Sequence, residues 1–256
     1  MRYTLGIDIG SGFSKAVVLA DRVVRASAVM ASGGSYRQAA DAVRDAALAG
    51  AGITAADIAS ATATGCGAGA VAFAGRSVTD ISCHAAGVHY LFPSARTVID
   101  IGAQFSKAIS VDANGNITNF VLNEKCAGGS GRFLQVIARI LHIDVEEIGP
   151  LSIGAKNPVE FTTGCAVFAE SEAVSRIAEG ATPADILAGV HRAMASKIAN
   201  LVTRVGLVRE VVITGGGAND SGLVQAISAE LETEVLTPEK PQITAALGAA
   251  LIAAAA

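Results

Sequence analysis

The nonapeptide DIGSGFSKA at residues 8–16 returns as DIGAQFSKA at residues 100–108, with seven of nine positions identical. An apolar run precedes each copy (LGI or TVI), and a second apolar run follows it (AVVLA or AISVD). Apolar runs on both sides of a glycine-rich turn predict strand, turn and strand, twice in one chain. In each copy the aspartate, Asp8 or Asp100, falls at the end of the first predicted strand.

Both turns have the composition of a phosphate site. Small residues let main-chain N–H groups approach a phosphate closely, and a carboxylate at the strand end can hold a hydrated Mg²⁺. Two such turns facing one another would clamp a polyphosphate from both sides. The simpler alternative is a pair of β-hairpins that share tight turns, with each aspartate only capping its own turn. The near-verbatim duplication favours the phosphate site.

A third glycine cluster lies in VVITGGGANDSGLVQAI, residues 211–227. The pattern predicts a buried strand, a glycine turn and a helix. A helix N-terminus and bare glycine backbone are the parts from which nucleotide sites are built. Because this cluster follows a duplicated phosphate hairpin, we expect it to contact the adenosine.

The rest of the chain alternates between helical and extended patterns. Helices are predicted at 35–52, 84–92, 166–179 and 183–205, and strands at 58–65 and 117–122. This alternation and the repeat predict an α/β protein of two like-folded halves with the ligand between them. We place the first domain at 1–94 and the second at 95–240, and we expect 241–256 to pack back on the first.

Composition argues against two classes of partner. The net charge is −4, and the sequence has no lysine- or arginine-rich stretch that could neutralise nucleic-acid phosphates. The longest apolar run, AALGAALIAAAA at 245–256, falls short of the ~18–20 residues that span a bilayer. The N-terminus reaches Asp8 before a signal-peptide apolar region is complete. We therefore expect a cytoplasmic protein without a nucleic-acid or membrane partner.

The four cysteines are Cys66, Cys83, Cys126 and Cys165, and no two of them form a CxxC motif. In a reducing compartment a disulfide framework is not expected, which leaves buried thiols, metal ligands or redox groups. Cys126, in NEKCAGGSGRF, comes just ahead of a glycine cluster, and Cys165, in TTGCAVFAE, follows Gly164; each stands just before a predicted helix.

The motifs together resemble a known family. DIGSGFSK and DIGAQFSK are similar to the two phosphate motifs of the acetate and sugar kinase/Hsp70/actin superfamily, and TGGGAN is similar to its adenosine motif. Five further stretches resemble the BadF/BadG/BcrA/BcrD ATPase family: TGCGAGAV, TDISCHAAG, NEKCAGGSGRFLQV, CAVFAESEAVSRIAEG and TPEKPQITAALGAALIA. This resemblance covers essentially the whole chain. It implies two actin/Hsp70-type (ribonuclease H-like) halves with a nucleotide cleft between them, and an iron–sulfur ATPase that delivers low-potential electrons.

The resemblance gives Cys126 and Cys165 the role of ligands to a [4Fe–4S] cluster shared between two chains. Such a cluster usually takes four thiolates, and a two-fold axis would present the same pair of thiols twice. Two positive helix ends would favour the anionic cluster. The alternative is a single-chain site that adds Cys66 and Cys83. We expect these two to be buried thiols that behave as small hydrophobes.

The resemblance also assigns ATP or ADP and Mg²⁺ to the glycine turns. The catalytic candidates are Asp8 and Asp100, which would hold Mg²⁺ through water, and Gln104, which would orient the attacking water. The nucleotide-binding candidates are Ser11, Gly12, Ser14 and Lys15 in the first turn, Gly102 and Ala103 in the second, and Gly215, Gly216, Gly217 and Asn219 in the adenosine motif.

One residue departs from the family pattern, because the second phosphate motif commonly carries an acid where this chain has Phe105. The departure either removes a ligand for Mg²⁺ or water, or leaves Phe105 as a core anchor in the same place as Phe13. In the first case the hydrolysis rate would suffer more than nucleotide binding.

The family implies an electron acceptor, either a 2-hydroxyacyl-CoA dehydratase or a benzoyl-CoA reductase, and self-pairing or pairing with a homologous subunit. Three alternatives stay open. The chain could be an ATP-binding subunit of benzoyl-CoA reductase with weak or no independent hydrolysis, a non-hydrolysing scaffold, or a small-molecule kinase of the same superfamily. The absorption spectrum of anaerobically purified protein separates the kinase from the iron-bearing alternatives.

Overall fold

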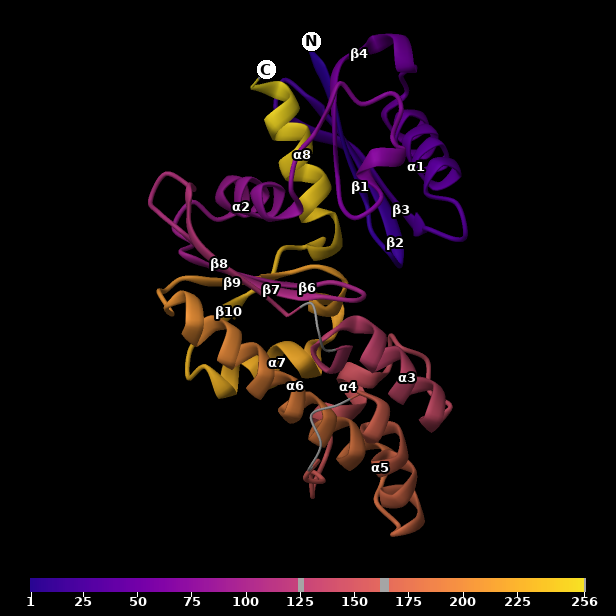
Figure 1. The fold of residues 1–256 in the computed structure, drawn as a ribbon, viewed down its shortest axis with the longest axis vertical. Coiled ribbons are helices and arrows are strands. Elements are labelled where there is room, and N and C mark those ends of the chain that lie inside the picture. Colours follow the sequence, from indigo (N-terminus) through magenta and orange to yellow (C-terminus); the bar gives the residue numbers. More distant parts are fainter. Residues whose placement is uncertain (124–126, 162–165, 256) are drawn as a thin grey trace. The chain divides into compact units, whose positions relative to one another are not determined.

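The computed structural model describes residues 1–123, 127–161 and 166–255. The chain forms two compact units, each with a sheet of its own (Figure 1). Unit 1 comprises Met1–Arg96, Val111–Thr118 and Pro238–Ala256, and unit 2 comprises Thr97–Ser110 and Asn119–Thr237.

A five-stranded mixed sheet forms the centre of unit 1. Its elements are β1 (Tyr3–Ile9), β2 (Phe13–Ala20), β3 (Val23–Ala31), α1 (Tyr36–Ala51), η1 (Ala55–Asp57), β4 (Ile58–Thr64), η2 (Ala68–Ala70), β5 (Arg76–Ser77), α2 (Asp80–Leu91), η5 (Pro241–Ile243) and α8 (Thr244–Ala254). The strand order is β3-β2-β1-β4-β5. β1 and β2 pair antiparallel through the first glycine turn, and β4 runs parallel to β1. The strand, turn and strand predicted over the first copy are confirmed.

Strand alternation gives the sheet of unit 1 an apolar surface on both faces. Ile7 packs in one core with Val43 of α1. Val17 packs in a second core with Leu247 of α8. The sheet therefore lies between α1 on one face and α8 on the other (Figure 1).

Small residues let α8 pack closely on its neighbours. A Cβ added at Gly6 of β1 would lie 2.0 Å from the Ala246 carbonyl oxygen, so only glycine admits the helix there. A Cβ at Gly248 would meet the Cys83 carbonyl of α2 in the same way. The C-terminal apolar run thus forms α8, which packs in the core of unit 1. Across the described part of the chain, none of the helices combines the length and apolar character needed to cross a bilayer.

Unit 2 repeats the arrangement of unit 1 around the second copy of the motif. Its elements are β6 (Thr97–Ile101), β7 (Ser106–Val111), β8 (Ile117–Asn123), η3 (Ala127–Gly129), α3 (Gly131–Leu141), α4 (Ile148–Ile153), α5 (Ala166–Ala178), α6 (Pro183–Val205), β9 (Val211–Thr214), η4 (Gly216–Asn219), α7 (Ser221–Glu230) and β10 (Val235–Leu236). The strand order is β10-β9-β6-β7-β8, with β6 antiparallel to β7 and parallel to β9. The predicted second hairpin and the strand, turn and helix at the third glycine cluster are confirmed.

The helices of unit 2 share one large core with its sheet. α6 begins with Thr182, which caps the amide of Asp185, and with Pro183 at the first helical position, where proline is well tolerated. Ile99 of β6 and Ile213 of β9 are fully buried in the same cluster as Val190 of α6. α6 and α7 lie along one face of this sheet (Figure 1).

Candidate functional site

Each hairpin holds a lysine against its aspartate. Asp8 and Lys15 are direct partners across β1 and β2, and Asp100 and Lys107 are partners across β6 and β7. Directly opposed residues of an antiparallel pair share one face of the sheet. The ammonium nitrogen therefore lies 2.8 Å from the carboxylate Oδ2 in both units. The repeated motif thus builds two fixed carboxylates, each beside a cation.

The turns are closed by main-chain bonds. The Gly10 amide donates to the Phe13 carbonyl at 3.1 Å, and the Gly102 amide donates to the Phe105 carbonyl at 2.9 Å. The two phenylalanine side chains are 38% and 39% exposed. The interpretation of Phe105 as a core anchor is therefore wrong, because the residue closes the turn through its backbone and leaves its ring at the surface.

The serine after each phenylalanine ties its hairpin to another segment. Ser14 Oγ lies 2.9 Å from Ser32 Oγ, and the Ser32 hydroxyl donates to the Gly10 carbonyl at 2.6 Å. Ser106 Oγ donates instead to the Gly129 carbonyl. The same position of the repeat therefore fixes β3 in unit 1 and the segment that leads into α3 in unit 2.

A further repeat emerges at the neighbouring parallel strands. Asp8 pairs with Thr64 of β4, and Asp100 pairs with Thr214 of β9. Each threonine is followed by a glycine with positive φ, at 86° for Gly65 and 82° for Gly215. The sequences TGCGA at 64–68 and TGGGA at 214–218 are thus structural counterparts.

Each of these glycines leaves room for its aspartate. A Cβ on Gly65 would lie 2.4 Å from Asp8 Oδ1, and a Cβ on Gly215 would lie 2.4 Å from Asp100 Oδ1. A side chain at either position would displace the carboxylate. Sequence reasoning missed Gly65, Thr64 and Lys107. Two signals could have found them: TGCGA and TGGGA are identical at four of five positions, and the second nonapeptide contains a lysine.

The predicted site residues gather in two places, one in each unit, where the central strands end. Asp8, Ser11, Gly12, Ser14 and Lys15 lie at the β1–β2 turn of unit 1, with the Ser14 side chain buried. In unit 2 the β6–β7 turn carries Asp100, Gly102, Ala103 and Gln104, and the turn after β9 carries Gly215, Gly216, Gly217 and Asn219. Gln104, Gly216 and Asn219 are exposed, whereas Gly215 and Gly217 are buried.

An open groove of about 830 Å³ borders the turn after β9. Asn219 stands at the turn, and α7 contributes Gln225 and Ser228 to the wall. Thr237, beyond β10, completes a lining that offers amide and hydroxyl groups. The lining also includes the Glu234 carboxylate and the apolar Ala218 and Val224, and the adenosine contact expected for TGGGAN stays a prediction.

The second turn also binds the start of α3. The first amides of a helix have no partner within the helix. Here the Gly131 amide donates to the Gly102 carbonyl and the Arg132 amide donates to the Ala103 carbonyl, both at 2.9 Å. The two carbonyls of the turn thus face α3, so a movement of the turn would be transmitted to that helix.

The described cysteines differ from expectation in one case. Cys83 is fully buried, and burial raises the pKa of its thiol to about 12. Cys66 is exposed in the TGCGA turn, with Sγ 3.7 Å from Tyr36 Oη, so the buried-thiol interpretation is wrong for it. This contact with Cys66 is the main cause that raises the pKa of Tyr36. The hypothesis for Cys126 and Cys165 falls on residues outside those that the structure describes.

The described ranges hold no ready-made metal site. Within 1–123, 127–161 and 166–255, no three His, Cys, Asp or Glu residues stand together as metal ligands. A cysteine binds a metal as the thiolate rather than as the thiol. The raised pKa of Cys83 therefore disfavours the single-chain site that would use it.

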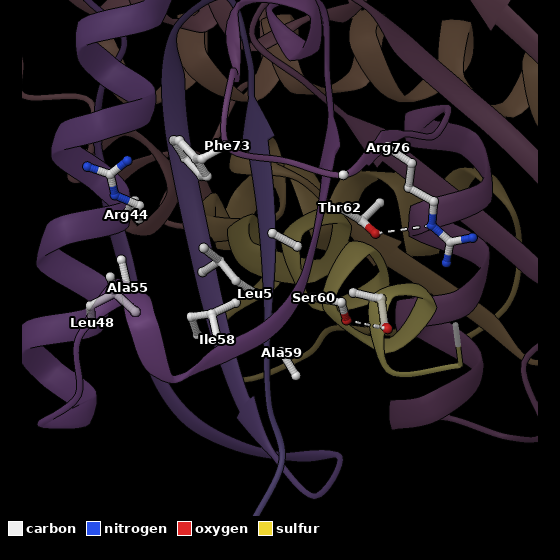
Figure 2. A pocket seen from close by; sticks show the side chains of 13 residues that line it. Leu5, Arg44, Leu48, Ala55, Ile58, Ala59, Ser60, Thr62, Phe73 and Arg76 are labelled. Atoms are coloured by element: carbon white, nitrogen blue, oxygen red, sulfur yellow. Dashed lines mark hydrogen bonds between the residues drawn. The ribbon is translucent and has the colours of Figure 1, made fainter.

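Unit 1 contains a second hollow, of about 490 Å³, beside β4 (Figure 2). Arg44 of α1 stacks over the Phe73 ring at 4.4 Å on one side. Arg76 Nε donates to Thr62 Oγ1 at 3.3 Å on the other. None of the predicted site residues lines this hollow, so it is distinct from the predicted nucleotide turns.

The paired hairpins, each with an aspartate, a lysine and a glycine turn on a neighbouring parallel strand, define a protein of the actin and Hsp70 fold type. More particularly, the chain belongs to the BadF/BadG/BcrA/BcrD ATPase family, whose model matches residues 5–253.

Named relatives cover nearly the whole chain. The activator of lactoyl-CoA dehydratase from Anaerotignum propionicum is 43% identical over 251 residues, which span 98% of this chain and 97% of that protein. A benzoyl-CoA reductase subunit from Thauera aromatica is 35% identical over 263 residues, at 98% and 93% coverage. The structure of the 2-hydroxyisocaproyl-CoA dehydratase activator from Clostridium difficile, with bound ADPNP, superposes with a TM-score of 0.95 at 42% identity, covering 98% and 94%.

Proposed function

We propose that this protein is a cytoplasmic ATPase that activates a 2-hydroxyacyl-CoA dehydratase by ATP-driven electron transfer. Near-complete coverage at 43% identity by a dehydratase activator supports the assignment to this branch of the family. ADPNP, an ATP analogue, is bound to the 42% identical activator, which supports a nucleoside triphosphate as the substrate. In this assignment the acceptor is the dehydratase, and its substrate is a CoA thioester.

The chain's own residues supply nucleotide binding. Asp8 and Asp100 would hold Mg²⁺ through water, since hydrated Mg²⁺ prefers carboxylate partners. Lys15 and Lys107 fix the carboxylates by their 2.8 Å contacts. Gln104 is exposed in the β6–β7 turn and would orient the attacking water. The amides of Ser11, Gly12, Gly102 and Ala103 would face phosphates, Ser14 would stabilise the first turn from within, and Gly215, Gly216, Gly217 and Asn219 would contact the nucleoside.

Cys126 and Cys165 would hold a [4Fe–4S] cluster jointly with the same two residues of a second chain. The count of suitable donors supports this: burial raises the pKa of the Cys83 thiol and disfavours its thiolate, which leaves three cysteines in one chain for a cluster that usually takes four. When bound, such a cluster supplies one-electron chemistry at low potential. The second chain would be another copy of this protein, paired through an isologous interface. A homologous subunit with the same two cysteines could supply the other two thiolates equally well.

The contact between the second turn and α3 carries the proposal that hydrolysis drives the transfer. Gly102 and Ala103 accept from the first amides of α3, and Ser106 donates to Gly129. Gain or loss of a γ-phosphate at this turn would therefore move residues 129–132. These residues follow Cys126 within six positions. Order changes in a segment that contacts the γ-phosphate are an established switching device.

An anaerobic activation assay tests the function. Dehydration of a 2-hydroxyacyl-CoA by a dehydratase should require this chain, a reductant and Mg²⁺·ATP together, and should persist when the chain is present below the dehydratase concentration. ATP hydrolysis without activation would contradict the dehydratase assignment. A phosphorylated metabolite formed in step with ATP loss would show the superfamily kinase instead.

The second candidate is a component of a benzoyl-CoA reductase. The 35% identity to the Thauera aromatica reductase protein over 98% of this chain favours it as the next assignment. Such a component would hydrolyse ATP weakly or not at all without its homologous partner. Activation of a dehydratase by this chain alone would exclude it.

A further inference from the structure

A buried side-chain network lies directly behind the nucleoside turn. His191 of α6 is 1% exposed. Its Nε2 lies 2.9 Å from Asp220 Oδ2, and its Nδ1 lies 2.9 Å from Ser152 Oγ. One imidazole ring thereby joins α6 to the start of α7 and to α4.

Serine, histidine and aspartate in contact also occur in hydrolases, but this serine is not open to a substrate. Ser152 is 6% exposed, and its hydroxyl donates to the Gly149 carbonyl at 2.8 Å within α4. Its nearest neighbours are packed backbone rather than a cavity, since a Cβ on Gly222 would overlap Ser152 Oγ. The network is therefore a structural joint.

Asp220 divides its two carboxylate oxygens between two tasks. Oδ1 accepts from the Leu223 amide at 3.0 Å and so caps α7. Oδ2 faces His191 Nε2 without the alignment of a hydrogen bond, and neither atom has a hydrogen-bond partner among the described residues. A buried polar atom without a partner is costly. Separating His191 Nε2 from Asp220 Oδ2 would leave each buried polar atom without the other, and this cost holds the two side chains together.

A single main-chain hydrogen bond connects Asp220 to the nucleoside turn. The Asp220 amide donates to the Gly217 carbonyl at 3.2 Å, and Asn219 precedes it in the chain. On the other side, a Cβ on Gly149 of α4 would lie 2.6 Å from Asp220 Oδ1, so α4 presses directly on the cap. The position of the turn is thus set by contacts from α4 and α6 as well as by its own glycines.

We propose that His191 is a positioning residue for nucleotide binding, which holds Asp220 and with it the turn Gly215–Asn219 against α4. The inference rests on the proposed nucleotide role of this turn. His191 touches neither phosphate nor Mg²⁺ in this role. Its loss should weaken the binding of substrate and product alike, which raises KM with little change in kcat.

Three variants test the proposal with steady-state ATP hydrolysis and with the affinity for a fluorescent ADP. His191→Ala should raise the KM for ATP and the Kd for ADP about tenfold, a loss of about 1.4 kcal/mol of binding free energy, because the turn is no longer held in place from α6. His191→Gln fills much of the same space and places a polar amide toward Asp220, so it should recover most of this loss. Asp220→Asn keeps an oxygen for the Leu223 amide, so α7 stays capped while the charged partner of His191 is removed, and it should resemble His191→Ala.

His89→Gln, on α2 of unit 1, is the matched histidine replacement and should leave both constants at parental values. A parental KM and Kd in His191→Ala, or equal losses in His191→Ala and His191→Gln, would overturn the positioning role. A parent that binds ADP without hydrolysing ATP would contradict the proposed ATPase, while the Kd series would still decide on His191. A parent that binds no ADP would overturn both.

Discussion

Lys107 Nζ lies 2.8 Å from Asp100 Oδ2, and both side chains are almost fully buried, at 9% and 4% exposure. Unit 1 repeats the contact at the same distance with Lys15 and Asp8, which are slightly more open at 13% and 10%. Removing one partner of a buried pair leaves an uncompensated charge and costs about 3–5 kcal/mol. Loss of either carboxylate should therefore lower stability as well as disturb the site.

Asp8→Asn and Asp100→Asn should each lower Mg²⁺-dependent ATP turnover by about 100-fold or more, the scale of losing one preorganised electrostatic group. Both variants should stay folded, and Asp100→Asn should lose more stability in denaturant unfolding because its lysine is the more buried. Asp144→Asn, an exposed carboxylate, is the control and should match the parent in both assays. Parental turnover in Asp8→Asn would remove that residue from the site.

Gly65→Ala and Gly215→Ala should abolish turnover through the carboxylates. Each added Cβ would lie 2.4 Å from an aspartate Oδ1 and would force it aside. Gly180→Ala separates this effect from backbone strain, because Gly180 also has positive φ, at 87°, with nothing within 4 Å of an added Cβ. That control should lose about 1–2 kcal/mol of stability and keep its ATPase rate. Equal rates in all three variants would show that the close approach is irrelevant to function.

Phe105→Asp should leave stability within about 0.5 kcal/mol, as is usual for surface positions, since the ring is 39% exposed. The acid common in the family would return, and we expect a higher Mg²⁺-dependent turnover. Phe13→Asp makes the same change at the equivalent position of unit 1, 38% exposed, and should bring no gain. An unchanged rate in Phe105→Asp would show that this chain hydrolyses ATP without that acid.

Stability at alkaline pH should depend on Cys83. Burial raises the pKa of the folded-state thiol to about 12, above the value of about 8.5 in an unfolded chain. The neutral thiol thus makes its full contribution to the free energy of unfolding below about pH 8.5, and this contribution is lost as the pH rises toward 12. Cys83→Ala should flatten the fall in unfolding free energy between pH 8.5 and 10.5, whereas Cys66→Ala should not. A parental slope in Cys83→Ala would contradict the burial of a protonated thiol.

Local patterns were enough to predict the hairpins and the third turn. Strand alternation around DIGSGFSKA and DIGAQFSKA is a short-range signal, and β1–β2 and β6–β7 follow it. Helix α2 begins at Asp80 rather than 84, because Thr79 caps it from within a stretch that looked irregular. The exposure of Phe105 escaped prediction, since hydrophobicity does not tell which side of a tight turn a ring takes.

Long-range contacts set the remaining features of the site. A cysteine in TGCGA concealed its correspondence with TGGGA until both strands were seen beside their aspartates. The Gly131 and Arg132 amides donate to the Gly102 and Ala103 carbonyls across 29 positions of the chain, which leaves no pattern in the sequence. The His191 network, drawn from three helices, is of the same kind.

Iron content per chain tests the central claim most directly. Anaerobically purified protein should contain about four irons per two chains, as four-thiolate ligation of one shared cluster requires, and a monomer should contain none. Symmetry removes two ligands with each change, so Cys126→Ser and Cys165→Ser should both be colourless and still bind ATP. Cys66→Ser and Cys83→Ser should keep the iron. Full iron in either Cys126→Ser or Cys165→Ser, or four irons on an isolated monomer, would contradict the shared cluster.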